Sequence, residues 1–143
     1  MLINKTKNKG LIDWLDEYDL HIKEIDEQHK RLAELINDFY QAFQTNQDEK
    51  SLYWILDNLL SETILHFSKE EAIMELHGYP GYALHKEEHD ILSKEVTNMF
   101  KGYIKGERNK SEKIGAFLKE WLINHIVKED KNLGEFLTAK GVI

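Results

Sequence analysis

Seven side chains in this sequence have the types and the spacing to bind metal ions. Two pairs stand four residues apart, His66 with Glu70 and His85 with His89, and residues four apart share one face of a helix. The chain contains no cysteine, so nitrogen and oxygen are the ligands available to a metal. Five imidazoles and two carboxylates pointing into one helical core would suit two iron ions. The candidates are His29, His66, Glu70, His85, His89, His125 and Asp130.

The number of histidines at inward positions is what favours a metal. A single core histidine is usually satisfied by one hydrogen bond, since histidine is only intermediate in its tendency to be buried. Five of the seven histidines fall on apolar stripes, and leaving a buried polar group unpaired costs about 1–3 kcal/mol. A metal centre would satisfy all five and would neutralise the carboxylates of Glu70 and Asp130. The remaining two, His21 and His77, are expected near the surface.

The apolar pattern predicts an all-α fold. Apolar or special positions recur every three or four residues, as in Ile25, His29 and Leu32, which is typical of helices with one buried face. Four helices with short connections favour an up-down-up-down antiparallel four-helix bundle. One domain over residues 1–143 would comprise an irregular N-terminal arm (1–21), helices at about 23–44, 50–77, 82–104 and 110–129, and a short C-terminal helical turn near 132–138.

Composition narrows the class of protein. The formal charge of -7 argues against a nucleic-acid partner, because such binding depends on neutralising phosphates. No apolar run approaches the roughly twenty residues that span a bilayer. The first ten residues are polar and lysine-bearing, which does not match a signal peptide. We expect a cytoplasmic protein with no membrane partner.

The strings around the candidate ligands resemble the hemerythrin family, especially its single-domain bacterial form. They are Ile25-Asp26-Glu27-Gln28-His29-Lys30, His66-Phe67 with Glu70-Glu71, and Asn124-His125-Ile126. The resemblance runs from Trp14 to Asp130 and fills all seven ligand positions. It implies two iron ions joined by an oxo or hydroxo bridge in a four-helix bundle, a fold that this family exemplifies, with dioxygen as ligand and partner.

The resemblance also implies how the ligands are divided. One iron would take His85, His89 and His125, the other would take His29 and His66, and Glu70 and Asp130 would bridge both. The second iron would then be one ligand short, and dioxygen would bind at that position.

One spacing does not fit a regular helix. Asp130 lies five residues after His125, whereas Glu129 lies four after it and is the better-phased carboxylate. Periodicity alone therefore selects Glu129, and the resemblance selects Asp130. We follow the resemblance and expect the fourth helix to loosen or end near residues 128–130.

Apolar residues beside the ligands are candidates for the wall of the dioxygen pocket, although they would equally serve as ordinary core. They are Leu32, Phe67, Trp121, Leu122 and Ile126. Glu62 lies four residues before His66 and so on the same helical face. It would either lie just beside the helix interface and reach solvent, or place a carboxylate near the iron that is one ligand short.

Reversible dioxygen binding for storage, delivery or scavenging is the leading function. An imidazole-rich ligand set contrasts with the carboxylate-rich set of ferritin-like di-iron proteins, which favours binding dioxygen over activating it. A di-iron enzyme acting on peroxide or nitric oxide, and an oxygen- or redox-sensing module, remain the alternatives. Whether the chain is an enzyme is left open, with a binding protein favoured.

Overall fold

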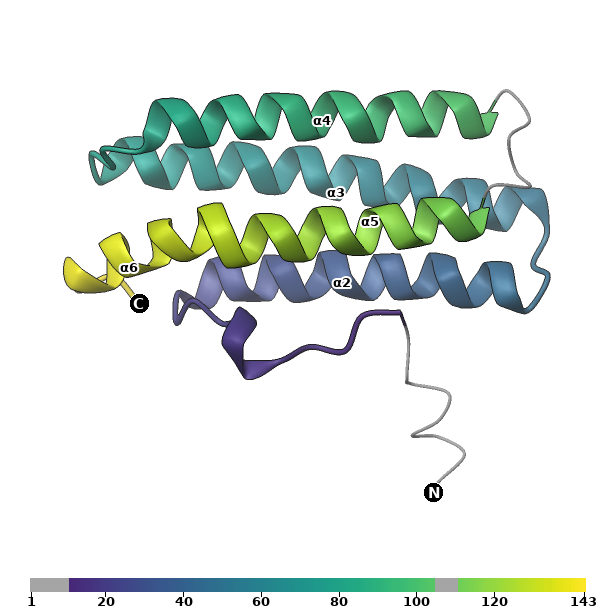
Figure 1. Cartoon of the computed structure of the whole chain (residues 1–143), viewed down its shortest axis with the longest axis horizontal. Helices are drawn as coiled ribbons and strands as arrows, with labels where there is room; N and C mark the ends of the chain where they lie inside the picture. The colour runs from purple at the N-terminus through teal and green to yellow at the C-terminus, as the bar shows by residue number, and fades with distance from the viewer. Residues whose placement is uncertain (1–10, 105–110) are drawn as a thin grey trace, which may run out of the picture.

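Four long helices packed side by side form the molecule in a computed structural model that describes residues 11–104 and 111–143. Each helix runs opposite to the one before it (Figure 1). α2 and α4 each lie against both α3 and α5, which closes the four into a bundle. The helices are α2 (Lys23–Gln44), α3 (Glu49–Leu76), α4 (Tyr82–Ile104) and α5 (Ser111–His125). The first ten residues of the expected arm, and the expected start of the fourth helix at residue 110, lie outside the described residues.

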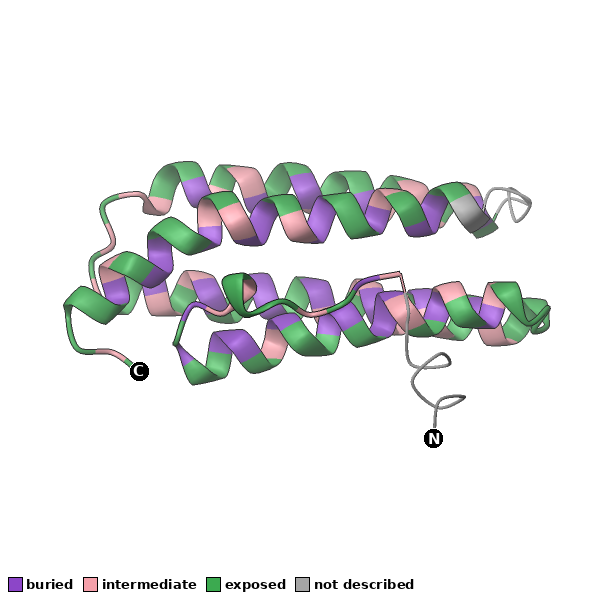
Figure 2. Cartoon of the chain, turned by 60° about the horizontal axis from the view of Figure 1, so that its bottom comes forward, coloured by how far each residue is buried: buried purple, intermediate pink, exposed green. Residues whose placement is uncertain are grey.

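The described part of the N-terminal arm runs along the outside of α2 (Figure 2), and hydrogen bonds between side chains of α2 and the backbone of the arm help to attach it. The Asn37 side chain pairs with the backbone of Ile12, accepting from its N–H at 2.7 Å and donating to its carbonyl at 2.8 Å. Near the start of α2, the Asp26 carboxylate accepts from the backbone N–H groups of Leu20 and His21 at 2.8 and 3.0 Å. The arm also contains one short 3-10 helix, η1 (Asp16–Tyr18).

The apolar core is divided into two clusters along the bundle. The larger cluster fills the middle and one end, and includes Phe39 and Leu118, both fully buried. The smaller cluster lies at the other end and includes Ile25, Met74 and Leu133. On α2 and α3 the buried ligand candidates fall between residues of the two clusters. A buried polar layer therefore separates two apolar layers.

The fourth helix neither stops near residue 129 nor stays regular. α5 continues into a π-helical turn, η3 (Ile126–Asp130), and then into α6 (Lys131–Ala139). The expected loosening is present, but the chain remains helical through it, and the expected short C-terminal turn is a helix of nine residues. α6 stays helical because its buried Leu133 and Leu137 complete the smaller apolar cluster.

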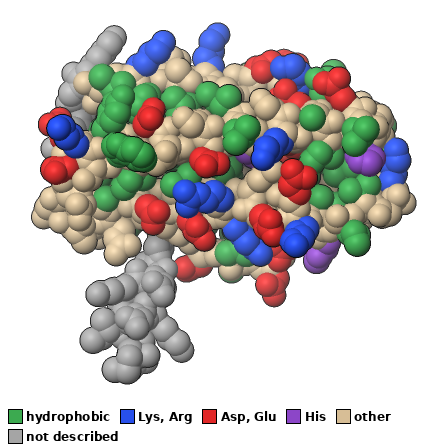
Figure 3. Space-filling view, turned by 180° about the vertical axis from the view of Figure 1, so that it is seen from behind, with side chains coloured by type: hydrophobic (Ala, Val, Ile, Leu, Met, Phe, Trp, Pro, Cys, Tyr) green, Lys and Arg blue, Asp and Glu red, His purple; other side chains and the backbone are tan. Residues whose placement is uncertain are grey.

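The surface carries intermingled acidic and basic side chains with apolar ones between them, as Figure 3 shows for the face seen from behind. Among the described residues, no helix has both the length and the hydropathy needed to cross a membrane.

Candidate metal centre

All four long helices direct buried polar side chains into the layer between the two apolar clusters. None of the seven ligand candidates is more than 4% exposed. α2 supplies His29, α3 supplies His66 and Glu70, and α4 supplies His85 and His89, while His125 ends α5 and Asp130 ends η3. The packing of these helices brings together side chains as far apart in the sequence as His29 and Asp130.

The seven side chains form two overlapping groups whose ligand atoms lie within 4.8 Å of one another. The first is Glu70, His85, His89, His125 and Asp130, and the second is His29, His66, Glu70 and Asp130. Glu70 and Asp130 belong to both groups. We call the first group the three-histidine half and the second group the two-histidine half.

Short distances connect the two carboxylates to histidines of both halves. Asp130 lies 2.8 Å from His29 Nε2 and 2.9 Å from His85 Nε2. Glu70 Oε1 lies 2.8 Å from His85 Nε2 and 2.9 Å from His89 Nε2. Both carboxylates are fully buried. They are therefore placed between the halves.

Several of these buried atoms are close to one another without being aligned for a hydrogen bond. Within the described residues, no hydrogen-bond partner is found for Nε2 of His29, His66 and His85, or for either oxygen of Glu70 and Asp130. Unsatisfied buried polar groups are rare in proteins. Lone pairs that converge on a shared volume are what a bound cation would satisfy, and imidazole with carboxylate suits iron. The donor set therefore fits the metal that the sequence predicts.

The π-helical turn explains how Asp130 reaches the centre. A π turn contains one more residue than an α-helical turn, so residues five apart share a face. Asp130 Oδ1 accordingly lies 3.1 Å from His125 Nε2 and is fully buried. Glu129 is half-exposed and lies 3.8 Å from the other ring nitrogen, Nδ1. The geometry therefore agrees with the assignment taken from the family resemblance rather than with the one taken from periodicity.

Two histidines are locked in the tautomer that a metal needs. His66 Nδ1 donates to Gln28 Oε1 at 2.6 Å, and His89 Nδ1 donates to Glu71 Oε2 at 2.8 Å. A proton held on Nδ1 leaves the Nε2 lone pair facing the centre. These two partners were not assigned a role from the sequence. In the sequence they stand beside His29 and Glu70, within the strings that resemble the hemerythrin family. Neighbouring residues on a helix point to different faces, so this position does not show which histidine each side chain would contact.

The pKa values of two histidines of the centre are shifted in opposite directions. Burial lowers the pKa of His66 to about 4, against the weaker pull of Glu70. Burial also acts to lower the pKa of His85, but the adjacent Asp130 and Glu70 carboxylates outweigh it and raise that pKa to about 10. Burial acts to raise the pKa of Asp130, yet the neighbouring His125 and His29 hold it well below its usual range. A protonated His85 thus supplies positive charge beside the two carboxylates, as a bound metal cation would.

The five apolar candidates for the pocket wall are all buried in the larger cluster. Phe67 is central among them, because its ring stacks on the His89 ring with centroids 4.0 Å apart and planes 10° apart. Its centroid is 5.7 Å from that of His125 and 6.1 Å from that of Trp121. Leu32 lines a cavity of about 40 Å³ beside His66, and Leu122 and Ile126 flank His125 in the sequence. Their role toward dioxygen stays a prediction.

Glu62 is half-buried and lines the same small cavity, together with Gln28, His66 and Lys69. Its carboxylate is in neither half of the centre. It thus lies beside His66 without joining the described ligand group.

Comparison with known proteins agrees with this geometry. The family model for the hemerythrin HHE cation binding domain matches residues 20–137. The chain belongs to the hemerythrin family. The match begins just before α2 and ends within α6, so it includes all seven ligand candidates.

Named relatives and a solved structure support the same assignment. A bacteriohemerythrin of Stenotrophomonas maltophilia is 34% identical over 130 residues, spanning 91% of this chain and 84% of that protein. One of Methylococcus capsulatus is 32% identical and spans 91% of this chain and 99% of that protein. A wild-type hemerythrin crystal structure superposes with a TM-score of 0.74 at 30% identity, covering 87% of this chain and 96% of the other. The four-helix bundle expected from the sequence is therefore confirmed.

Proposed function

We propose that this chain is a non-heme di-iron protein that binds dioxygen reversibly. The observation that carries the proposal is the division of seven buried donors into two groups that share Glu70 and Asp130. A single ion would not use two separated sets of histidines. Family membership adds the expectation of non-heme iron.

In this proposal the ligands follow the two halves of the centre. His85, His89 and His125 would hold one iron, His29 and His66 the other, and the shared carboxylates would bridge the pair, together with an oxo or hydroxo group. The two-histidine half offers one protein donor fewer, which leaves a position for a small ligand. When bound, the iron pair supplies the electrons that hold dioxygen.

The surrounding residues orient the ligands and exclude water. Gln28 and Glu71 hold His66 and His89 with Nε2 facing inward. Phe67 covers the His89 ring and is only 4% exposed. A dry apolar wall would slow the proton-assisted loss of reduced dioxygen, because protons reach a buried site through water.

Binding is favoured over catalysis by the balance of ligands. Carboxylate-rich shells are typical of ferritin-like di-iron proteins, whereas this centre has five imidazoles and two carboxylates. Fewer anionic donors stabilise high-valent iron less well. The chain would therefore hold dioxygen and release it again.

Iron analysis combined with visible spectroscopy tests the proposal. The reduced, iron-loaded chain is expected to hold two irons and to gain an intense visible band when dioxygen is added. That band should disappear when dioxygen is removed and return on a second addition. Oxidation without the band, or steady turnover of peroxide or nitric oxide with a reductant, would favour an enzyme instead.

A further inference from the structure

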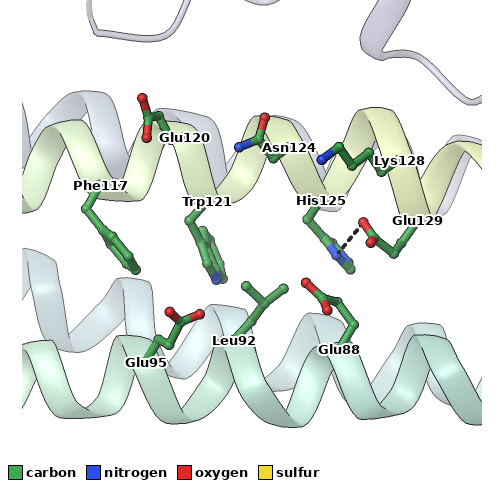
Figure 4. A pocket seen from close by; sticks show the side chains of 10 residues that line it. All are labelled: Glu88, Leu92, Glu95, Phe117, Glu120, Trp121, Asn124, His125, Lys128 and Glu129. Carbon is green, nitrogen blue, oxygen red and sulfur yellow. Dashed lines mark ion pairs between the residues drawn. The ribbon is translucent and has the colours of Figure 1, made fainter.

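A second group of possible metal ligands lies just outside the three-histidine half, where α4 faces α5. Glu88, His125 and Glu129 have ligand atoms within 4.8 Å of one another. They line a cavity of about 300 Å³, and Figure 4 shows all three side chains directed toward it. Glu88 and Glu129 also line a neighbouring cavity of about 520 Å³ that reaches His85. These two glutamates therefore stand between two openings that each lead to a histidine of the centre.

His125 connects the outer group to the centre. His125 is 4% exposed, and its Nδ1 atom is buried and has no hydrogen-bond partner in the described structure. Nδ1 lies 3.8 Å from Glu129 Oε2 (Figure 4), while Nε2, on the other side of the ring, lies 3.1 Å from Asp130. One ring thus presents one nitrogen to the cavity and the other to the centre.

The charge around the cavity favours cations. Two more carboxylates, Glu95 and Glu120, line it farther along the same helices, against one basic side chain, Lys128. Neither Glu88 nor Glu129 has a Lys or Arg partner within salt-bridge distance in the described structure. A cleft lined by charges of one sign raises the local concentration of the opposite ion.

We propose that Glu88, Glu129 and His125 Nδ1 form an entry site that captures ferrous iron and passes it to the three-histidine half. The inference rests on the proposed di-iron function. Two carboxylates with one imidazole suit a divalent iron ion. A neutral imidazole has one free lone pair, so the ion can move from Nδ1 to Nε2 only as the ring proton moves from Nε2 to Nδ1, and the two nitrogens of His125 bind iron in succession. Iron therefore occupies the entry site only until the three-histidine half has bound its ion.

The opposite side of the bundle offers no comparable entrance among the described residues. The cavity beside His66 is about 40 Å³, and its glutamate, Glu62, faces the same space as Lys69. Apart from His66 of the two-histidine half, no residue that lines this cavity belongs to a group of ligand atoms in the described structure. Iron for both halves would therefore enter between α4 and α5.

Anaerobic uptake of ferrous iron by the iron-free full-length chain tests the entry site. Samples are quenched with a coloured ferrous chelator at successive times, and bound iron is counted. Glu88→Gln with Glu129→Gln should slow uptake by about 10-fold at low iron, the scale on which residues beside a metal site act, and leave the final content at two irons. Asp57→Asn with Glu135→Gln removes two exposed carboxylates elsewhere and should leave the rate near that of the unchanged chain.

The outcomes separate the entry site from the function on which it rests. Equal uptake rates in the two double variants, with two irons bound at the end, would overturn the entry site alone. An unchanged chain that never binds two irons would overturn the dinuclear assignment and the entry site together. If the Glu88–Glu129 double variant fails to retain iron, Glu88→Gln alone decides, because slowed uptake supports the site and normal uptake overturns it.

Discussion

The two halves of the centre share their carboxylates but differ in almost everything around them. The three-histidine half lies against the α4–α5 face, where two cavities of about 300 and 520 Å³ reach its histidines. The two-histidine half lies on the α2–α3 side, beside a cavity of about 40 Å³. A carboxylate, Glu71, holds His89, whereas an uncharged amide, Gln28, holds His66.

Ions and small molecules can therefore reach the three-histidine half through its cavities, whereas the two-histidine half is nearly closed. Acidic groups that line a cleft raise the local concentration of cations. A nearly closed half with one donor fewer can keep a coordination position free for a small neutral ligand. The two halves thus share the same two carboxylates but differ both in their number of histidines and in the residues around them.

Removing a ligand common to both halves should change the iron content more than any other substitution considered. Glu70→Gln should reduce the iron content from two per chain to one or fewer, since the neutral amide no longer balances the charge of either ion. Metal analysis after purification measures this. Glu34→Gln, an exposed change on α2, is the control, and two irons retained by Glu70→Gln would show that the halves do not depend on that residue.

In the iron-free protein, His85 and His66 should make the free energy of unfolding depend on pH in opposite directions. The pKa of His85 is raised to about 10, so its stabilising effect is complete below 6.5 and is lost as pH rises toward 10. The pKa of His66 is lowered to about 4 in the folded protein. Between pH 6.5 and 4 only the unfolded chain takes up this proton, so the free energy of unfolding decreases as pH falls through that range. Each effect amounts to about 1.4 kcal/mol per pKa unit.

Denaturant unfolding across pH separates these contributions. His85→Gln should flatten the alkaline loss of unfolding free energy, and His66→Gln should flatten part of the acid loss. Identical pH profiles for the two variants would contradict the electrostatic difference between the halves.

A smaller effect is expected from the residues that orient the ligands. Glu71→Gln should weaken iron retention by about 10-fold, because a charged acceptor makes the His89 imidazole a stronger ligand. Gln28→Glu should act in the opposite direction on His66. Chelator competition measures both, and a gain in retention by Glu71→Gln would contradict the assigned role.

The smallest effect is expected at Glu62. Glu62→Leu should leave the decay of the dioxygen-bound protein unchanged, since this half-buried carboxylate belongs to neither group of ligand atoms. Timed visible spectra measure the decay. A clear slowing would show that Glu62 does act on the open position.

The sequence predicted the bundle because burial in long helices follows a regular repeat. Ile25, His29 and Leu32 are spaced for one face, and all three are buried. The same rule failed at residues 125–130, where an extra residue in the turn shifts the phase. A π turn has no simple signature in residue spacing, so the carboxylate it brings inward was chosen by family resemblance.

The sequence does not show the surroundings of polar and charged residues that lie beside the apolar face of a helix. Glu88 is half-buried against a cavity, which its position one residue before His89 does not indicate. Gln28 and Glu71 adjoin ligands in the chain but bond to histidines of other helices. Such contacts depend on how neighbouring helices are rotated, which periodicity within one helix does not specify.

A crystal structure of the iron-loaded chain, with anomalous scattering recorded at the iron edge, is the decisive test of the dinuclear centre. The dinuclear assignment predicts two adjacent iron peaks, one in contact with His85, His89 and His125, the other with His29 and His66, and both with Glu70 and Asp130. A single peak, or a peak that contacts none of these histidines, would contradict it.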